Sequence, residues 1–352
     1  MWRYIARRLL SGLVMLFAAT LMTFAVFRLI PFTPACIIVP CGPGTTTTDA
    51  QIRAAEHKLG TDRPVPVQYA KFVWGIFRHG TFGRSWRTGG SVDQSLRAAL
   101  PQTISVLLGG IVVLLLLAIP LAALSALRAQ TVVDRAILLF AIFGIALHPL
   151  LLGVGLTNFF SEYLHVLPLG SYCHLLPVKH HAPPGPTTFT GPPGTSMPVI
   201  GSQCGGPLHW AQHMVLPWLT FALFFLPLYT RMIRTRFIET MDAQYVVAAR
   251  GRGVPELRLI RSHALRPALL PLVTMVGLDL GGALMAVIYI DSIYGLSGIG
   301  TLLLNGIADR VTATYDLPLI AAVFFVVAAF TIFVTFVVDI LYAWLDPRVR
   351  PA

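Results

Sequence analysis

The sequence has 352 residues, of which 55% are hydrophobic and 12% are charged. That charged share is about half that of an ordinary soluble domain, so most of the apolar surface must be covered by lipid. The formal net charge of +11 does not indicate nucleic-acid binding, because that function needs basic and aromatic residues gathered on a solvated domain. Here the positive charges separate apolar segments, which predicts a membrane protein.

Apolar runs predict six membrane-spanning helices in an all-α polytopic fold. The first run follows Arg3, Arg7 and Arg8 and is longer than the apolar part of a cleavable signal peptide, so we expect an uncleaved span that starts in the cytoplasm. A further apolar piece at 295–307 is too short to cross a bilayer. The six runs cover residues 9–27, 98–127, 136–161, 214–230, 268–293 and 317–338.

Composition divides the chain into three parts. Residues 1–30 are expected to hold the cytoplasmic N-terminus and the first helix. Residues 31–97 are polar and rich in proline, and they predict an external domain with short amphipathic helices at 49–59 and 67–77. Residues 98–352 are expected to form the core of the protein with the other five membrane helices.

The segment 231–267 is the most informative part of that core. It holds eight of the 26 Lys and Arg residues against three acids, so it cannot lie in lipid. Ala248, Ala249 and Gly253 are small, and the last two are four residues apart, which predicts one helical face that another backbone can approach closely. Pro255 is suited to the first position of a second helix.

The distribution of charge predicts the orientation in the membrane. Six spans that start in the cytoplasm place the basic segment and both termini on the cytoplasmic side. That side receives 15 of the 26 Lys and Arg residues, all on short segments, in agreement with the positive-inside rule.

Three polar side chains, His148, Asp279 and Asp291, fall within or at the end of predicted spans. A carboxylate at the bilayer centre costs about 2.5–3.5 kcal/mol, so Asp279 must face the bundle interior or a water-filled path, whereas Asp291 is expected at an outer end. For His148 and Asp279 we favour hydrogen bonding between helices, with contact to a transported solute as the alternative. The span of Asp279 also holds glycines that allow close helix contact, at positions 277, 281 and 282.

The stretch 162–212 is rich in Pro, Gly and Thr and predicts an external loop. The four cysteines all fall in the two regions predicted to be external, and disulfides can form there if the compartment is oxidising. Their pairing cannot be read from the sequence. Because no CxxC pair occurs, we predict no metal site. The cysteines group as Cys36 with Cys41 and Cys173 with Cys204.

Seven stretches, in this order and spacing, resemble the membrane subunit of an ABC importer of the dipeptide and oligopeptide permease family. The resemblance extends along nearly the whole chain and implies the type I importer permease fold, with 98–352 as the permease core. The stretches are LGTDRPVPVQY (59–69), GTFGRSW (80–86), IPLAALSAL (119–127), VLPLGSY (166–172), YVVAARGRGV (245–254), HALRPALLP (263–271) and LYAWLDPRVR (341–350).

The same resemblance implies a role for the basic segment. The alanine-alanine-x-x-x-glycine signature of importer permeases falls on Ala248, Ala249 and Gly253, which implies a coupling segment that docks into a cleft of an ATPase subunit. The other residues expected to take part in coupling are Val254, Pro255, Glu256, Arg258 and Arg261. The resemblance implies a second homologous permease subunit, two ATP-binding subunits and an external solute-binding protein as partners.

No ATP site is predicted in this chain. A phosphate-binding loop needs GxxxxGK followed by Ser or Thr, and the only lysines, Lys58, Lys71 and Lys179, lie in other contexts. We therefore expect a transport subunit without enzymatic activity or cofactor of its own, with ATP and Mg²⁺ bound by the partner ATPase subunits. Peptides would cross the cytoplasmic membrane by alternating access, and Asp279 could meet their terminal ammonium group.

Several residues depart from the family pattern. Val247 stands where many importers have an acid, and residues 32–34 stand where members often have Gly-Asp-Pro. The Glu and Pro-Gly usual at the exit of the fifth span appear as Asp291 and Ser297-Gly298, and 180–200 resembles an insertion. These changes bear on the substrate and the binding-protein contact rather than on the mechanism.

Other functions remain open. Related permeases carry nickel chelates, glutathione or oligosaccharides. A secondary transporter would need no ATPase, but it would often show inverted repeats or ion-binding carboxylates in broken helices, and only Asp279 fits that description. A polytopic enzyme is weakly supported, because neither HExxH nor GxSxG occurs.

Overall fold

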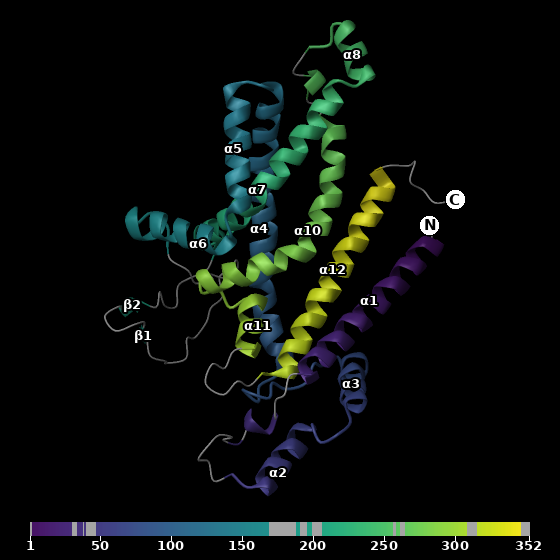
Figure 1. Ribbon diagram of the computed structural model, residues 1–352, viewed down its shortest axis with the longest axis vertical. Coiled ribbons are helices and arrows are strands. Elements are labelled where there is room, and N and C mark those ends of the chain that lie inside the picture. The colour runs from purple at the N-terminus through teal and green to yellow at the C-terminus, as the bar shows by residue number, and fades with distance from the viewer. Residues whose placement is uncertain are drawn as a thin grey trace.

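The computed structural model shows an elongated helical molecule whose longest helices run along or obliquely to its long axis (Figure 1). The helix α8 (Gln244–Gly251) lies at one end and α2 (Asp49–Leu59) lies at the other. Facts about the structure refer to the described residues, which are 2–29, 34–37, 39, 47–168, 188–190, 196–198, 206–255, 258–260, 265–307 and 315–345.

Within the described residues, five helices are long and apolar enough to cross a membrane, and a sixth span is obtained if one bent pair is counted as a single span. The prediction of six spans therefore depends on that pair, which consists of α5 (Val132–Ala146) followed by α6 (Pro149–Thr157) and the π-helix η3 (Asn158–Tyr163). The five long helices are α1 (Trp2–Leu29), α4 (Val92–Leu127), α7 (Pro207–Met241), α10 (Leu265–Ile293) and α12 (Leu317–Leu345).

The continuous run predicted at 136–161 is broken in the structure. The α5 segment Val132–Gly144 and the segment Pro149–Tyr163, which contains α6 and η3, meet at a bend of 105°. His148 directly precedes α6 and has an extended backbone (ψ 146°). Proline disfavours the helical conformation in the residue that precedes it, and its own missing N–H suits the first position of a new helix. Pro149 therefore explains the break, which the apolar composition concealed.

The span predicted at 214–230 is much longer than expected. The helix α7 continues through Pro217 and Pro227 and on through the basic residues to Met241. The helix α4 likewise contains Pro120 without ending there, as predicted. In both helices, proline interrupts one backbone hydrogen bond while packing against neighbouring helices preserves the helix.

Glycines permit the closest helix contacts in the bundle. In α4, a Cβ atom on Gly109 would lie 2.1 Å from the ring of Trp218 in α7, so only glycine fits. In α10, Cβ atoms on Gly277 and Gly281 would lie 2.2 Å from Val338 and 2.8 Å from Thr331 of α12, whereas one on Gly282 would meet no described side chain within 4 Å. The predicted close contact is thus confirmed for two of the three glycines.

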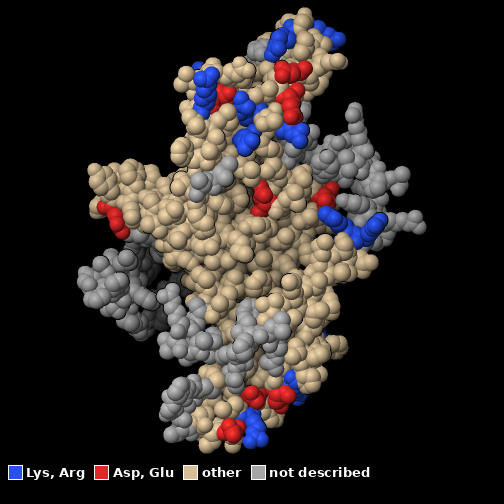
Figure 2. Space-filling view, in the orientation of Figure 1, with Lys and Arg blue, Asp and Glu red and all other residues tan. Residues whose placement is uncertain are grey.

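The helix α1 packs along α12, and Arg8 forms an ion pair with Asp339 there. The N-terminal end of α1 and the C-terminal end of α12 both point toward the α8 end of the molecule (Figure 1). On the face shown in Figure 2, most charged residues lie toward the two ends, a few lie just above mid-height, and the band below these is nearly uncharged, as expected of a protein that spans a membrane.

The remaining elements are short. Beyond α1 lie the 3₁₀-helix η1 (Pro34–Ile37), α2, α3 (Val65–Trp74) and the π-helix η2 (Gly75–His79). The strands β1 (Thr188–Thr190) and β2 (Ser196–Pro198) pair antiparallel. A short helix, α11 (Ile299–Ile307), follows α10, at the apolar piece predicted at 295–307.

Candidate functional site

The helix α8 projects from the bundle at the end of α7 (Figure 1). One side chain, Val246, is completely buried and anchors the helix. By contrast, Ala248 and Arg250 are exposed, and Ala249 is half-buried. The helix therefore presents small and basic residues on an accessible surface, as a docking segment requires.

Gly253 ends this helix in a left-handed conformation (φ 79°). Its N–H donates to the carbonyl of Arg250 at 3.0 Å, and the N–H of Val254 donates to the carbonyl of Ala249 at 3.3 Å. These two bonds form a Schellman motif, in which a glycine stops the helix and satisfies its last carbonyls. The expectation that Ala249 and Gly253 share one helical face is therefore wrong, because α8 ends at Gly251.

The chain turns again after Gly253. Pro255 is exposed, and its carbonyl accepts hydrogen bonds from the N–H groups of Arg258 (2.9 Å) and Leu259 (3.0 Å). These are the bonds with which a helical turn starts, and the placement of Pro255 at the first position of a helix stays a prediction. Leu259 is fully buried while Arg258 is exposed. Two residues predicted to take part in coupling, Glu256 and Arg261, lie outside the described residues.

A buried ion pair ties α7 to the neighbouring helices near the α8 end. The guanidinium of Arg234 donates to both oxygens of Asp134, with both distances 2.7 Å. Asp134 also accepts from the Ser125 hydroxyl at 2.5 Å and from the Gln130 N–H at 2.9 Å. A carboxylate with four donors is fully satisfied despite its burial. Sequence reasoning missed this pair, because residues 100 positions apart carry no local signal.

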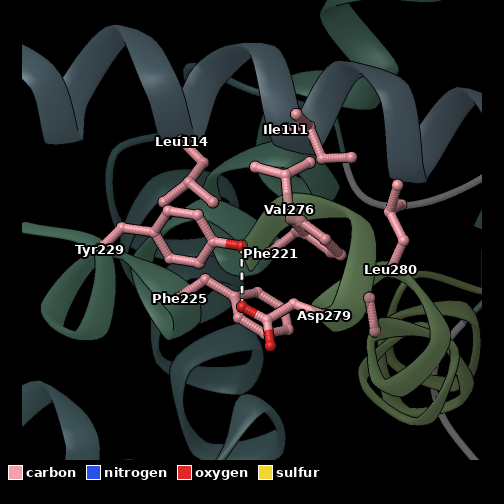
Figure 3. A pocket seen from close by; sticks show the side chains of 9 residues that line it. Ile111, Leu114, Phe221, Phe225, Tyr229, Val276, Asp279 and Leu280 are labelled. Atoms are coloured by element: carbon pink, nitrogen blue, oxygen red, sulfur yellow. Dashed lines mark hydrogen bonds between the residues drawn. The ribbon is translucent and has the colours of Figure 1, made fainter. Parts of the chain in front are cut away.

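Asp279 lies in a pocket between α4, α7 and α10 (Figure 3). Its Oδ2 accepts a hydrogen bond of 2.8 Å from the hydroxyl of Tyr229. The carboxylate is half-buried, and within the described part of the chain Tyr229 is its only hydrogen-bond partner. The apolar and aromatic residues of the pocket are Ile111, Leu114, Phe221, Phe225, Val276, Leu280 and Ala283.

His148 and Asp291 do not join Asp279 in this pocket. The Nδ1 atom of His148 accepts from the N–H of Leu150 at 3.2 Å, and its ring meets the edge of Tyr289 with 4.5 Å between centroids. Asp291 is completely buried, and its Oδ2 accepts from the N–H of Gly300 at 3.0 Å. Its carboxylate faces the N-terminus of α11, where a negative charge is favourable. Asp291 is close to the last residue of α10, Ile293, and its position at the outer side of the membrane stays a prediction.

Asp316 is another carboxylate that joins distant segments, and no sequence pattern marks it. It is buried, it precedes α12, and it accepts from the Ser85 hydroxyl and from the backbone N–H of Trp86 at 3.1 Å. The same carboxylate accepts from the N–H of Leu319 at 3.4 Å. This one side chain therefore holds the GTFGRSW stretch against the start of the last helix.

The cysteine predictions fall largely outside the described residues. Cys36 is disulfide-bonded. Cys41, Cys173 and Cys204 are not among the described residues, so the pairing of the four cysteines stays a prediction. No group of three or more His, Cys, Asp or Glu residues that could hold a metal ion occurs within the described ranges.

Two family models match the chain. Residues 118–351 match the model described as the inner membrane component of a binding-protein-dependent transport system. Residues 1–108 match the model for the N-terminal part of a membrane component of such systems. Together the matches include α7, α8 and α10 in full and all of α4 except residues 109–117.

Relatives are similar over almost their whole length. The probable D,D-dipeptide transport system permease protein DdpB of Escherichia coli (strain K12) is 32% identical over 346 residues, which are 98% of this chain and 97% of that protein. The di/tripeptide transport system permease protein DppB of Pseudomonas aeruginosa (strain UCBPP-PA14) is 30% identical over 351 residues, which are 99% of each chain.

Proposed function

The chain belongs to the family of binding-protein-dependent transport system inner membrane components, and from this premise we propose that it translocates short peptides in an ATP-driven importer. It is a multi-pass permease subunit of the inner membrane. Peptides are the proposed substrate because relatives at 30–32% identity over their full length are named for dipeptide or di/tripeptide transport.

The family implies partner proteins in general, and we propose a specific set of them. A second homologous permease forms the pathway together with this chain, two ATPase subunits bind ATP and Mg²⁺, and an external binding protein delivers the peptide. The composition supports this division of labour, because none of the three lysines lies in a phosphate-binding loop.

In the proposed orientation, the α8 end faces the cytoplasm. The ends of α1 and α12 that carry the termini point the same way (Figure 1), so both termini are cytoplasmic. The positive-inside rule favours this orientation, since short basic segments concentrate at that end. The elements at the α2 end would then face the binding protein.

The observation that carries the proposal is the exposed helix α8 at the end of an uninterrupted α7. One of the two ATPase subunits would bind α8, and α7 would pass the movement of α8 to the wall of the pocket that holds Tyr229. The ion pair between Arg234 and Asp134 would make α5 move with α7, and the hydrogen bond from Ser125 to Asp134 would make α4 move with them. Alternating access would follow from this rigid connection.

An importer of nickel chelates, glutathione or oligosaccharides would use the same coupling elements, and a secondary transporter would not need them. The exposed α8 favours an ATP-coupled importer over a secondary transporter. Between importers, the names of the relatives favour peptides.

The test places a large, charged side chain on the exposed surface of α8. In the assembled transporter, Ala248→Arg should abolish uptake and release the ATPase subunits during purification, while membrane insertion stays normal. The matched control is Ala54→Arg, which changes an exposed alanine of α2 at the opposite end and should retain the ATPase subunits. If Ala248→Arg kept both the ATPase subunits and normal uptake, the proposed coupling role of α8 would be wrong.

A further inference from the structure

The carboxylate of Asp279 lies where a charge is costly. It belongs to a membrane-spanning segment, Thr274–Ile293, and an ionised carboxylate at mid-bilayer costs about 2.5–3.5 kcal/mol. Within the described part of the chain, no Lys or Arg forms an ion pair with it. Its only hydrogen-bond donor there, the Tyr229 hydroxyl, donates to Oδ2, so Oδ1 accepts no hydrogen bond from the described residues.

Aromatic rings surround this carboxylate on one side. Phe221, Phe225 and Tyr229 are spaced four residues apart and therefore lie on one face of α7. The ring centroids of Phe221 and Phe225 are 4.9 Å apart, and those of Phe225 and Tyr229 are 6.4 Å apart. In Figure 3, the rings of Phe225 and Tyr229 lie beside Asp279. Aromatic faces next to a carboxylate favour a cation, because both present negative potential to it.

The size of the cavity limits what can enter. It measures about 10 Å³, which is the room for about one group of the size of a water molecule. A primary ammonium group has that size, whereas a whole peptide or a bulky side chain does not. The pocket therefore fits the charged end of a larger solute.

We propose that Asp279 and the aromatic face of α7 bind the N-terminal ammonium group of the peptide as it crosses the membrane. This inference rests on the proposed function and deepens it, because it names the feature of the substrate that the permease itself recognises. The ammonium donates to Oδ1 of Asp279 and lies against the Phe225 ring, while Tyr229 positions the carboxylate through Oδ2. The rest of the peptide stays outside this small cavity.

The experiment compares tri-alanine with N-acetyl-tri-alanine in proteoliposomes that contain the assembled transporter and its binding protein. The wild-type complex should carry tri-alanine at least about tenfold faster, since a hydrogen bond to a charged group is lost on acetylation. Asp279→Asn should slow tri-alanine uptake by about tenfold or more. Because the amide still accepts from Tyr229, a purely structural role for Asp279 would leave the rate unchanged.

Three further variants make the result specific. Asp279→Glu keeps the charge and should retain much more tri-alanine uptake than Asp279→Asn, and it also serves if the Asn variant fails to assemble. Tyr229→Phe should cause a smaller loss than Asp279→Asn. Asp339→Asn removes a different carboxylate of the spans, the one paired with Arg8, and should leave the preference between the two peptides unchanged.

The possible failures are distinguishable. Equal wild-type rates for the two peptides, wild-type tri-alanine uptake in Asp279→Asn, or equal losses in the Asn and Glu variants would each overturn the ammonium subsite and leave the proposed function standing. If the wild-type complex carried neither peptide in the presence of ATP, the proposed function would fail, and the subsite would fail with it.

Discussion

At the scale of single residues, Gly253 determines where the helix α8 ends. Its positive φ places it in the left-handed region, where an L residue with a Cβ atom pays about 1–2 kcal/mol. Among the described residues other than its chain neighbours, no atom lies within 4 Å of the position that a Cβ would occupy. The requirement for glycine within the chain is therefore conformational rather than steric.

We predict that Gly253→Ala lowers ATP-coupled uptake several-fold, because about 1 kcal/mol of backbone strain would loosen the end of α8. Gly253→Asn should be less harmful, since asparagine adopts the left-handed conformation more readily. Uptake rates of the two variants, with hydrogen exchange of 244–255 as a structural readout, would check this order. Equal losses would instead indicate that the partner's surface needs the small residue.

At the scale of helices, α10 joins the pocket of Asp279 to the last span. One face carries Gly277 and Gly281 against α12, and Asp279 reaches the pocket shared with α4 and α7. The close glycine contact sets the distance between α10 and α12, and the hydrogen bond from Tyr229 joins Asp279 on the same helix to α7. Packing and the site are thus linked through one helix.

Gly277→Ala should destabilise the protein by about 1–3 kcal/mol, because its methyl group would lie 2.2 Å from Val338 and force α10 and α12 apart. Gly282→Ala, in the same helix, meets no described side chain within 4 Å and should be neutral or stabilising by up to about 1 kcal/mol. Thermal unfolding of the two variants in detergent measures the difference. Similar midpoints for both variants would contradict the packing described for α10.

At the scale of the whole molecule, the apolar runs and the positive charges predicted the helical membrane fold, because lipid imposes a simple requirement for length and composition. They could not predict the break before Pro149 within an apolar run. The segment after Arg231 reads as helical, but the sequence did not indicate that this helix is continuous with the fourth span, as α7 is up to Met241.

The site was predictable only where its signal is local. The small residues 248, 249 and 253 mark a short sequence pattern, and Asp279 stands out as a carboxylate in an apolar run. The contacts from Asp134 to Arg234 and from Asp316 to Ser85 join segments 100 and 231 residues apart, and single-sequence patterns carry no information about such pairs. The contact of Asp279 with Phe225 and Tyr229 could not be predicted either, because these residues are about 50 positions away in the sequence.

Uptake of labelled tri-alanine by proteoliposomes tests ATP-driven peptide import most directly. The proteoliposomes contain the assembled transporter, with its binding protein outside and ATP inside. We predict that the peptide accumulates only when ATP and the binding protein are both present, and that an ion gradient cannot replace ATP. Accumulation driven by an ion gradient without ATP would contradict ATP-driven import. The chain would then act in a secondary transporter, and no ATPase subunit would be needed to bind α8.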